Sequence, residues 1–144
     1  MKYTLYDINT GRITSSFQTD DINHVDLNLA NSNYIDGIYS NEQYYINNGE
    51  PVLKPIDPSD SLHKYIFDYN EKSWILNVDQ TKNLIRQARN RALMIIDRVN
   101  PVWYASLTAD QQQELQQYRT QLLNVPQQSG FPTTIDWPNK PSWL

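Results

Sequence analysis

The sequence predicts an α+β fold: an N-terminal lobe of antiparallel β-hairpins, then a C-terminal helical hairpin with an extended tail rich in proline and tryptophan. Three observations predict it. Turn residues separate short β-type runs in the first half, helical periodicity begins after Asn77, and prolines punctuate residues 126–141. A chain of 144 residues suffices for one domain or two small lobes. We expect a β lobe over residues 1–77, a two-helix segment over 78–125, and the tail over 126–144.

Three stretches of the first half combine turn residues with aromatic or β-branched neighbours: "YDINTGRI" (6–13), "YYINNGEPV" (44–52) and "FDYNEKSWI" (67–75). In each, Asn is followed closely by Gly or Lys, and Asn and Gly adopt positive φ at little cost. Three hairpins therefore predict about six strands. Residues 20–37 show no clean period. Three prolines in residues 51–61 indicate a crossing loop.

Helical periodicity begins near Asp79. Apolar residues recur at steps of three and four along one face: Leu84, Ile85, Ala88, Ala92, Ile95, Ile96 and Val99. We predict an amphipathic helix capped by Asp79 and ended at Asn100, because Pro101 disfavours helical geometry in the residue before it.

A second helix is predicted from Thr108, which forms a capping box with Gln111, to about Asn124 before Pro126. Its apolar stripe is narrow and its remaining surface is rich in glutamine. The stripe consists of Leu115, Tyr118, Leu122 and Val125. The pattern favours either an antiparallel helix pair or a helix lying on the sheet.

The tail contains four prolines that favour an extended chain without internal hydrogen bonds. Its large apolar residues would be left in water unless they lie on a surface; they are Phe131, Ile135, Trp137, Trp143 and Leu144. We therefore expect the tail to dock, on its own domain or on another chain.

Composition narrows the function classes. Hydrophobic content of 39% and a net charge of −4 indicate neither a membrane span nor a charged tail. The first ten residues lack the features of a secretory signal, so we expect the protein to act where it is made. Without cysteine there is no disulfide framework and no thiolate zinc site.

No constellation of residues predicts catalysis. His24 and His63 belong to no metal-ligand spacing, and "DINTG" from Asp7 departs from a calcium loop because Gln18 stands where a bidentate Glu is needed. With 4 glycines, phosphate-cradling loops are hardly available. We expect no enzymatic activity, no catalytic residue, no cofactor and no metal.

Basic residues gather on the first helix: Lys82, Arg86, Arg89, Arg91 and Arg98. A net charge of −4 gives little attraction for phosphate, so we interpret them as a solvated rim and expect no nucleic-acid partner. A membrane partner is not expected either.

The order of motifs resembles the tail fibre assembly proteins of tailed bacteriophages, also called phage tail assembly chaperones. The resemblance extends over essentially the whole chain and is most specific in three C-terminal motifs. These are "RQARNRALMIID" (Arg86, Arg89, Asn90, Leu93, Asp97), "YRTQLLNVP" (Tyr118, Arg119, Leu122, Asn124, Val125, Pro126) and "FPTTIDWPNKP" (Phe131, Pro132, Ile135, Trp137, Pro138, Pro141). Met94, Ile96 and Leu123 depart from the residues usual in the family.

The resemblance implies a helper that binds a phage tail fibre or receptor-binding protein, so that its β-rich trimer forms correctly. It also implies action in the cytoplasm of the infected bacterial host, with retention in the particle for some relatives. An alternative function is a permanent virion component, a fibre tip or tail adaptor that holds the receptor-binding element. A weaker third option is a glycan-binding module built on Tyr34, Tyr39, Tyr44 and Tyr45, although such rings more often pack across hairpins.

Five residues are predicted to contact the partner or to hold the tail. Phe131, Trp137 and Trp143 are expected to lie on the client or on the chain's own helices. Tyr118 and Arg119 are expected to tether the tail, because they project from the second helix just before the tail begins. The identity of the client and the oligomeric state stay open at this point.

Overall fold

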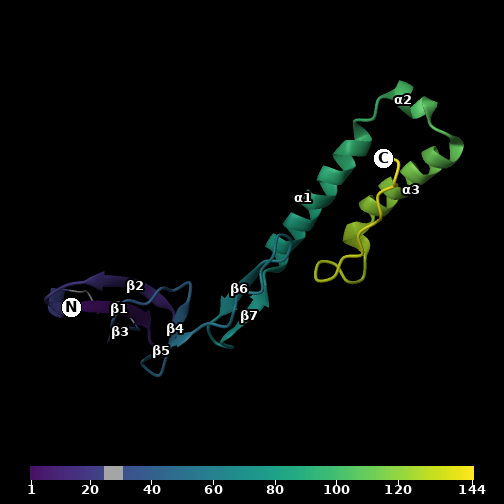
Figure 1. Cartoon of the computed structure of the whole chain (residues 1–144). Coiled ribbons are helices and arrows are strands. Elements are labelled where there is room, and N and C mark those ends of the chain that lie inside the picture. The colour runs from purple at the N-terminus through teal and green to yellow at the C-terminus, as the bar shows by residue number, and fades with distance from the viewer. Residues whose placement is uncertain (25–30) are drawn as a thin grey trace. The chain divides into compact units, whose positions relative to one another are not determined.

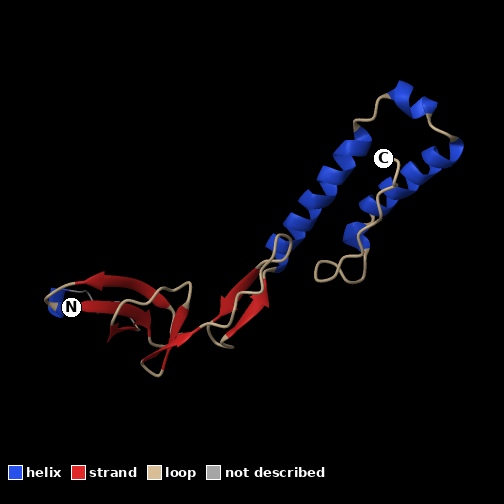
Figure 2. Ribbon diagram, viewed as in Figure 1, coloured by secondary structure: helices blue, strands red, loops and turns tan. Residues whose placement is uncertain are grey.

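The computed structural model describes residues 1–24 and 31–144 (Figure 1). The chain divides into two compact units. The first, here called the β unit, comprises residues 1–58 and 65–75, and the second, the helical unit, comprises residues 59–64 and 76–144. Antiparallel strands make up the N-terminal half and helices the C-terminal part, so the predicted α+β class is confirmed (Figure 2).

The β unit contains a three-stranded sheet and two hairpins. Its sheet has the order β2-β1-β3, formed by β1 (Lys2–Asp7), β2 (Ile13–Gln18) and β3 (Ser32–Asp36). The hairpins pair β4 (Tyr44–Asn47) with β5 (Glu50–Leu53), and β6 (Tyr65–Asp68) with β7 (Ser73–Leu76). The three predicted hairpins are present. The segment without a clean period adds a short 3-10 helix, Ile22–His24, and strand β3, while its residues 25–30 lie outside the described residues.

Two of the hairpins share one loop design. Asp7 Oδ1 accepts hydrogen bonds from the backbone N–H groups of Asn9 (2.9 Å) and Thr10 (3.0 Å). Asp68 Oδ1 likewise accepts hydrogen bonds from the backbone N–H groups of Asn70 (2.8 Å) and Glu71 (3.0 Å). Four residues after each aspartate the backbone turns through positive φ, at Gly11 (74°) and at Lys72 (54°). A carboxylate that mimics a backbone turn thus sets both loops.

The third hairpin turns at Asn48 and Gly49, whose φ angles of 52° and 81° fit the tight turn expected for an Asn-Gly pair. Its strand β4 approaches the first loop closely, since the Ile46 N–H donates to Gly11 O at 2.8 Å. A Cβ atom at Gly11 would lie 1.9 Å from Ile46 O. Glycine is therefore required there, where Tyr6, Ile13 and Ile46 form the buried cluster of this unit.

The helical unit contains α1 (Val78–Asp97), α2 (Pro101–Ser106), α3 (Ala109–Leu123) and the 3-10 helix Val125–Gln127. Two predicted details of α1 are wrong, and one helix that follows it was not predicted. Asn77, not Asp79, caps α1 by accepting from the Gln80 N–H at 3.2 Å, and Asp79 lies in the first turn. The helix ends at Asp97 rather than Asn100. The short helix α2 was not predicted, although Asn100 caps it and Pro101 begins it, an arrangement that favours a helix start.

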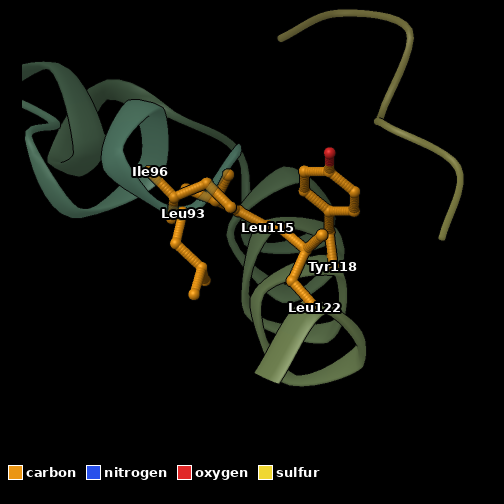
Figure 3. Packing of buried hydrophobic residues seen from close by; sticks show 5 residues of the cluster. All are labelled: Leu93, Ile96, Leu115, Tyr118 and Leu122. Atoms are coloured by element: carbon orange, nitrogen blue, oxygen red, sulfur yellow. The ribbon is translucent and has the colours of Figure 1, made fainter. Parts of the chain in front are cut away.

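The predicted start of the second helix is confirmed. The Gln111 N–H donates to Thr108 Oγ1 (3.2 Å), and the Thr108 N–H donates to Gln111 Oε1 (2.9 Å), so the capping box is complete. Helices α1 and α3 run in opposite directions (Figure 2), and their facing side chains form the core of the unit (Figure 3). The core residues are Leu93, Ile96, Leu115, Tyr118 and Leu122.

One side of α1 was assigned incorrectly from the periodicity. Ile95, placed on the predicted apolar face, is 62% exposed, whereas Leu93, which was left out of that face, is buried. Thr81 is also fully buried, and the hydrogen bond that its hydroxyl accepts from the Lys64 N–H at 3.1 Å replaces the lost contact with water. The buried face of α1 therefore lies slightly to one side of the predicted one.

The tail is not free of internal hydrogen bonds, so that expectation was wrong. The Thr134 N–H donates to Gly130 O (2.8 Å), and the peptide bond between Phe131 and Pro132 is cis. The Gln128 side-chain amide binds the backbone of Asp136 twice, donating to its O at 2.8 Å and accepting from its N–H at 2.9 Å. These bonds fold residues 128–136 into a compact loop, and residues 137–141 that follow have no regular secondary structure.

Candidate partner-binding surfaces

The helical unit has an apolar cleft of about 340 Å³ where the end of α1, α2 and the first half of α3 meet. Five apolar or aromatic side chains line it together with three polar ones: Ile96, Val99, Pro101, Tyr104 and Leu115, with Asp97, Gln116 and Arg119. The cleft therefore offers apolar walls with a small number of polar groups, the usual composition of a binding pocket in proteins.

Hydrogen bonds at this cleft join the three helices. Arg119 Nε donates to Asp97 Oδ1 at 2.8 Å, which links α3 to α1. Both side chains are about half exposed, at 46% and 47%. Gln116 Nε2 donates to the Tyr104 hydroxyl (2.8 Å) and links α3 to α2. The polar rim is thus preorganised by contacts within the unit.

Helix α2 presents apolar side chains to solvent beside this cleft. None of its six residues is buried, Val102 is 79% exposed and Trp103 is 38% exposed. An exposed aromatic residue next to an apolar cleft is a common feature of protein interfaces, in which Trp, Tyr and Arg are enriched. Periodicity gave no signal for this surface, because α2 is too short to show a repeat.

Tyr118 and Arg119, the two residues of α3 that were predicted to tether the tail, make different contacts. Tyr118 is 8% exposed and belongs to the core between α1 and α3 (Figure 3). Trp143 and Leu144 also pack against this core. Arg119 forms its ion pair with Asp97, so this contact joins two helices rather than a helix and the tail. The structure therefore places Tyr118 in the interior and Arg119 at the cleft.

The predicted aromatic residues of the tail lie on the chain's own helical unit. The Arg86 guanidinium lies 5.7 Å from the centroid of the Phe131 ring. Trp143 Nε1 donates to Glu114 Oε2 at 2.6 Å, and its ring centroid is 6.3 Å from that of Trp103. Trp137 is half-buried beside a polar surface pocket that includes Gln128 and Asp136. These contacts place the tail against the chain's own helices, and contact of these rings with a partner stays a prediction.

The β unit contains a second hollow, an aromatic groove of about 720 Å³ with both polar and apolar walls. Lys54 is one of its lining residues. Its Nζ donates to the Tyr69 hydroxyl at 2.9 Å and to Asn41 O, and it lies 4.8 Å from the ring centroids of Phe67 and Tyr69. These cation–π contacts add to the hydrogen bonds. Sequence reasoning missed this groove because its walls come from segments far apart in the chain.

The four tyrosines considered for glycan binding do not line this groove, and each of them packs on another aromatic ring. Tyr34 meets Tyr3 edge to face at 5.4 Å, and Tyr39 meets Tyr44 in the same way at 5.3 Å. Tyr45 lies against Phe67 with centroids 5.4 Å apart. Each of these rings is engaged in packing, which is the common role of aromatic pairs in hairpins.

One carboxylate has a strongly shifted pKa. Hydrogen bonds from the backbone N–H groups of His63 (2.6 Å) and Leu62 (2.7 Å) to Asp60 Oδ1 lower the Asp60 pKa from 3.8 to about 2. The His63 ring stands 3.1 Å from the same carboxylate. The contacts stay within one turn of four residues, which indicates a structural role.

Among residues 1–24 and 31–144, no three His, Cys, Asp or Glu side chains are grouped so as to hold a metal ion. In the same described residues, no helix combines the length and apolar character needed to span a membrane.

Comparison with known proteins gives a family match in the C-terminal part of the chain. Neither the curated proteins nor the solved structures include a match to the chain. Residues 82–142 match the family model described as phage tail assembly chaperone protein. This segment holds most of α1, all of α2 and α3, the apolar cleft and nearly all of the tail. The resemblance seen in the three C-terminal motifs is thus confirmed for this segment, which is similar to the phage tail assembly chaperone family.

Proposed function

We propose that this protein is an assembly chaperone that binds a phage tail fibre or receptor-binding protein and promotes its folding and trimerisation. The observation that carries the proposal is the family match over residues 82–142. The client would be a protein of the phage tail, and the work would be done by binding alone, without a catalytic step, a cofactor or a metal. The place of action would be the cytoplasm of the infected bacterium.

The client would bind at the cleft of the helical unit and at helix α2. Every residue that lines the cleft lies inside the matched segment, as do the exposed Val102 and Trp103. Apolar surface next to fixed polar groups suits a chaperone, because the unassembled subunit of a trimer exposes apolar area that will later be buried. Arg119 would add a polar contact at the edge of the cleft.

Half-buried rings of the tail would extend this surface. Trp143 lies against Trp103 of α2, so the two indoles form a continuous aromatic area. Trp137 and Phe131 would contact the client from the compact loop of the tail. Tyr118 would act from the core by holding α3 in place, since only 8% of it is exposed.

The test is co-expression with the tail fibre protein from the same phage genome. Soluble fibre trimer is measured by size-exclusion chromatography with light scattering, with and without this protein. The variants Val102→Asp and Trp103→Ala alter the exposed face of α2, and Gln113→Ala on the exposed polar face of α3 is the matched control. Circular dichroism checks that each variant keeps its helices.

We expect soluble trimer to appear only with the wild-type protein and with Gln113→Ala, and to elute free of the chaperone. Co-elution at a fixed ratio, together with presence in washed particles, would instead favour the permanent virion component. If trimer yield does not depend on this protein and no complex forms, the proposal is wrong. If trimer yield depends on this protein but the α2 variants also behave like wild type, the function stands and the assigned surface is wrong.

A further inference from the structure

The aromatic groove of the β unit is not explained by the proposed chaperone function. All of its lining residues lie between Arg12 and Trp74, before the segment that matches the chaperone family begins at residue 82. Its volume of about 720 Å³ is within the range of pockets that bind small organic ligands. The groove is therefore a candidate for a separate binding activity.

The aromatic side of the groove is held rigidly. Trp74 Nε1 donates to Pro55 O at 2.8 Å, which fixes the plane of the indole. Phe67 meets Trp74 and Tyr69 edge to face, at centroid distances of 5.4 and 5.1 Å. The Tyr69 hydroxyl in turn donates to Asn41 Oδ1 at 2.7 Å. These contacts orient the rings before any ligand arrives, which lowers the entropic cost of binding.

Trp74 and Tyr65 are the rings best placed to meet a ligand. Both line the groove and both are half-buried, so part of each remains accessible. The Lys54 ammonium group lies 4.8 Å from the ring centroids of Phe67 and Tyr69 and 5.9 Å from that of Trp74, so of these three rings it covers Trp74 least. An aromatic face that is half open to solvent offers an apolar platform of limited area, suited to a flat ligand with an apolar face.

The polar side of the groove consists of side chains with planar end groups. Arg12, Glu42 and Asp57 are exposed at its walls, and Asn41 is half-buried. Guanidinium, carboxylate and amide groups can each make paired hydrogen bonds. With Lys54 and Arg12 on one hand and Glu42 and Asp57 on the other, the formal charges of the lining balance. A balanced lining gives no preference for a strongly charged ligand.

We propose that this groove binds an uncharged oligosaccharide. A pyranose ring has one face made mainly of C–H groups, which packs on an aromatic ring, and an edge of hydroxyl groups, which pair with planar side chains. The groove supplies both halves of this chemistry within one hollow. Trp74 and Tyr65 are the stacking residues, and Glu42, Asp57 and Arg12 bind the hydroxyl groups. This activity is independent of the chaperone function.

The experiment is a glycan array probed with the full-length protein, carrying neutral oligomers of hexoses, N-acetylhexosamines and deoxyhexoses, with uronic acid oligomers as charged comparisons. The strongest neutral oligosaccharide is then titrated by calorimetry. Trp74→Ala removes the platform and Trp74→Phe restores a ring. Glu42→Gln removes one carboxylate acceptor, and Glu50→Gln is its matched control, because Glu50 is an exposed glutamate of the same unit outside the groove.

We expect Trp74→Ala to weaken binding about tenfold or more, Trp74→Phe to recover most of the affinity, and Glu42→Gln to weaken binding about tenfold. Glu50→Gln should bind as wild type does. If the wild-type protein gives no stronger signal on the array than Trp74→Ala does, the proposal is wrong. A clear preference for the charged oligomers also overturns it. If no sugar binds but groove variants reduce capture of the tail fibre protein, the groove is a protein contact and the proposal is wrong. Fibre trimerisation is measured separately, so either function can fail alone.

Discussion

Different interactions stabilise the interior of each unit. The helical unit is stabilised by one apolar seam, in which side chains from two long helices fill the space between them (Figure 3). In the β unit, the buried cluster of Tyr6, Ile13 and Ile46 is small, and much of the remaining cohesion comes from loop geometry and from the Lys54 contacts. The helical unit thus depends mainly on side-chain volume, and the β unit depends more on backbone conformation and polar contacts.

The largest expected effect is the loss of volume in the seam. Leu122→Ala removes a side chain that is 1% exposed, and we expect it to lower the free energy of unfolding of the helical unit by about 2–5 kcal/mol. Amide hydrogen exchange measured by mass spectrometry resolves the two units. Protection should fall in α1 and α3 and stay unchanged in β1 and β2. An equal loss in both units would contradict the comparison, since it would show one cooperative structure.

The second largest effect is expected from backbone strain in the β unit. Gly11→Ala forces a residue with a Cβ into positive φ and toward Ile46 O, and we expect a loss of about 3 kcal/mol from strain and from the displaced hydrogen bond. Gly49→Ala is the matched control. It has a similar φ of 81° but no atom near the new Cβ, so it should lose only about 1 kcal/mol. Chemical denaturation measures both, and equal losses would mean that the close approach to Ile46 is unimportant.

A smaller effect is expected at the Lys54 cluster. Lys54→Met keeps most of the side-chain volume but removes the bonds to Tyr69 and Asn41 and the charge above two rings. We expect a loss of about 1–2 kcal/mol from the β unit. Chemical denaturation together with hydrogen exchange in β6 and β7 provides the measurement. Unchanged or increased stability would show that this unit, like the helical one, is held mainly by apolar packing.

The smallest effect concerns pH. The Asp60 pKa is lowered to about 2 in the folded protein by two backbone N–H donors. A lowered pKa means that the carboxylate stabilises the fold above its ordinary pKa of 3.8, and that this contribution is lost as the pH falls from there to about 2. Asp60→Asn should therefore flatten the pH dependence of the urea midpoint in this window. An identical slope in wild type and variant would contradict it.

Local signals in the sequence were sufficient for part of the fold. The Asn48-Gly49 turn, the other two hairpins and the Thr108–Gln111 capping box depend on residues within a few positions of each other, and all are present. Errors arose where neighbouring choices compete. Asn77 and Asp79 are both good caps, and Ile95 and Ile96 cannot both face one seam, so tertiary packing decided each case.

The binding surfaces were harder to predict. Family motifs pointed to Arg119, Phe131, Trp137 and Trp143, but not to the exposed face of α2, which has no repeat to reveal it. The aromatic groove joins Arg12, Asn41, Lys54 and Trp74, whose proximity depends on contacts between distant segments. The tail was expected to be extended because of its prolines, yet the Gln128 side chain supplies the bonds that fold it back on Asp136.

The chain passes between the two units three times, after residues 58, 64 and 75. The short segment 59–64 belongs to the helical unit and is bonded to the start of α1. The Lys64 N–H donates to Thr81 Oγ1, and Lys64 O accepts from the Asn77 N–H at 2.7 Å. A hybrid gene joined between residues 64 and 77 would take Lys64 from one parent and Asn77 and Thr81 from the other, so these contacts would join two different sequences. Recombination between related genes should therefore preserve the fold best when residues 59–81 are inherited as one block.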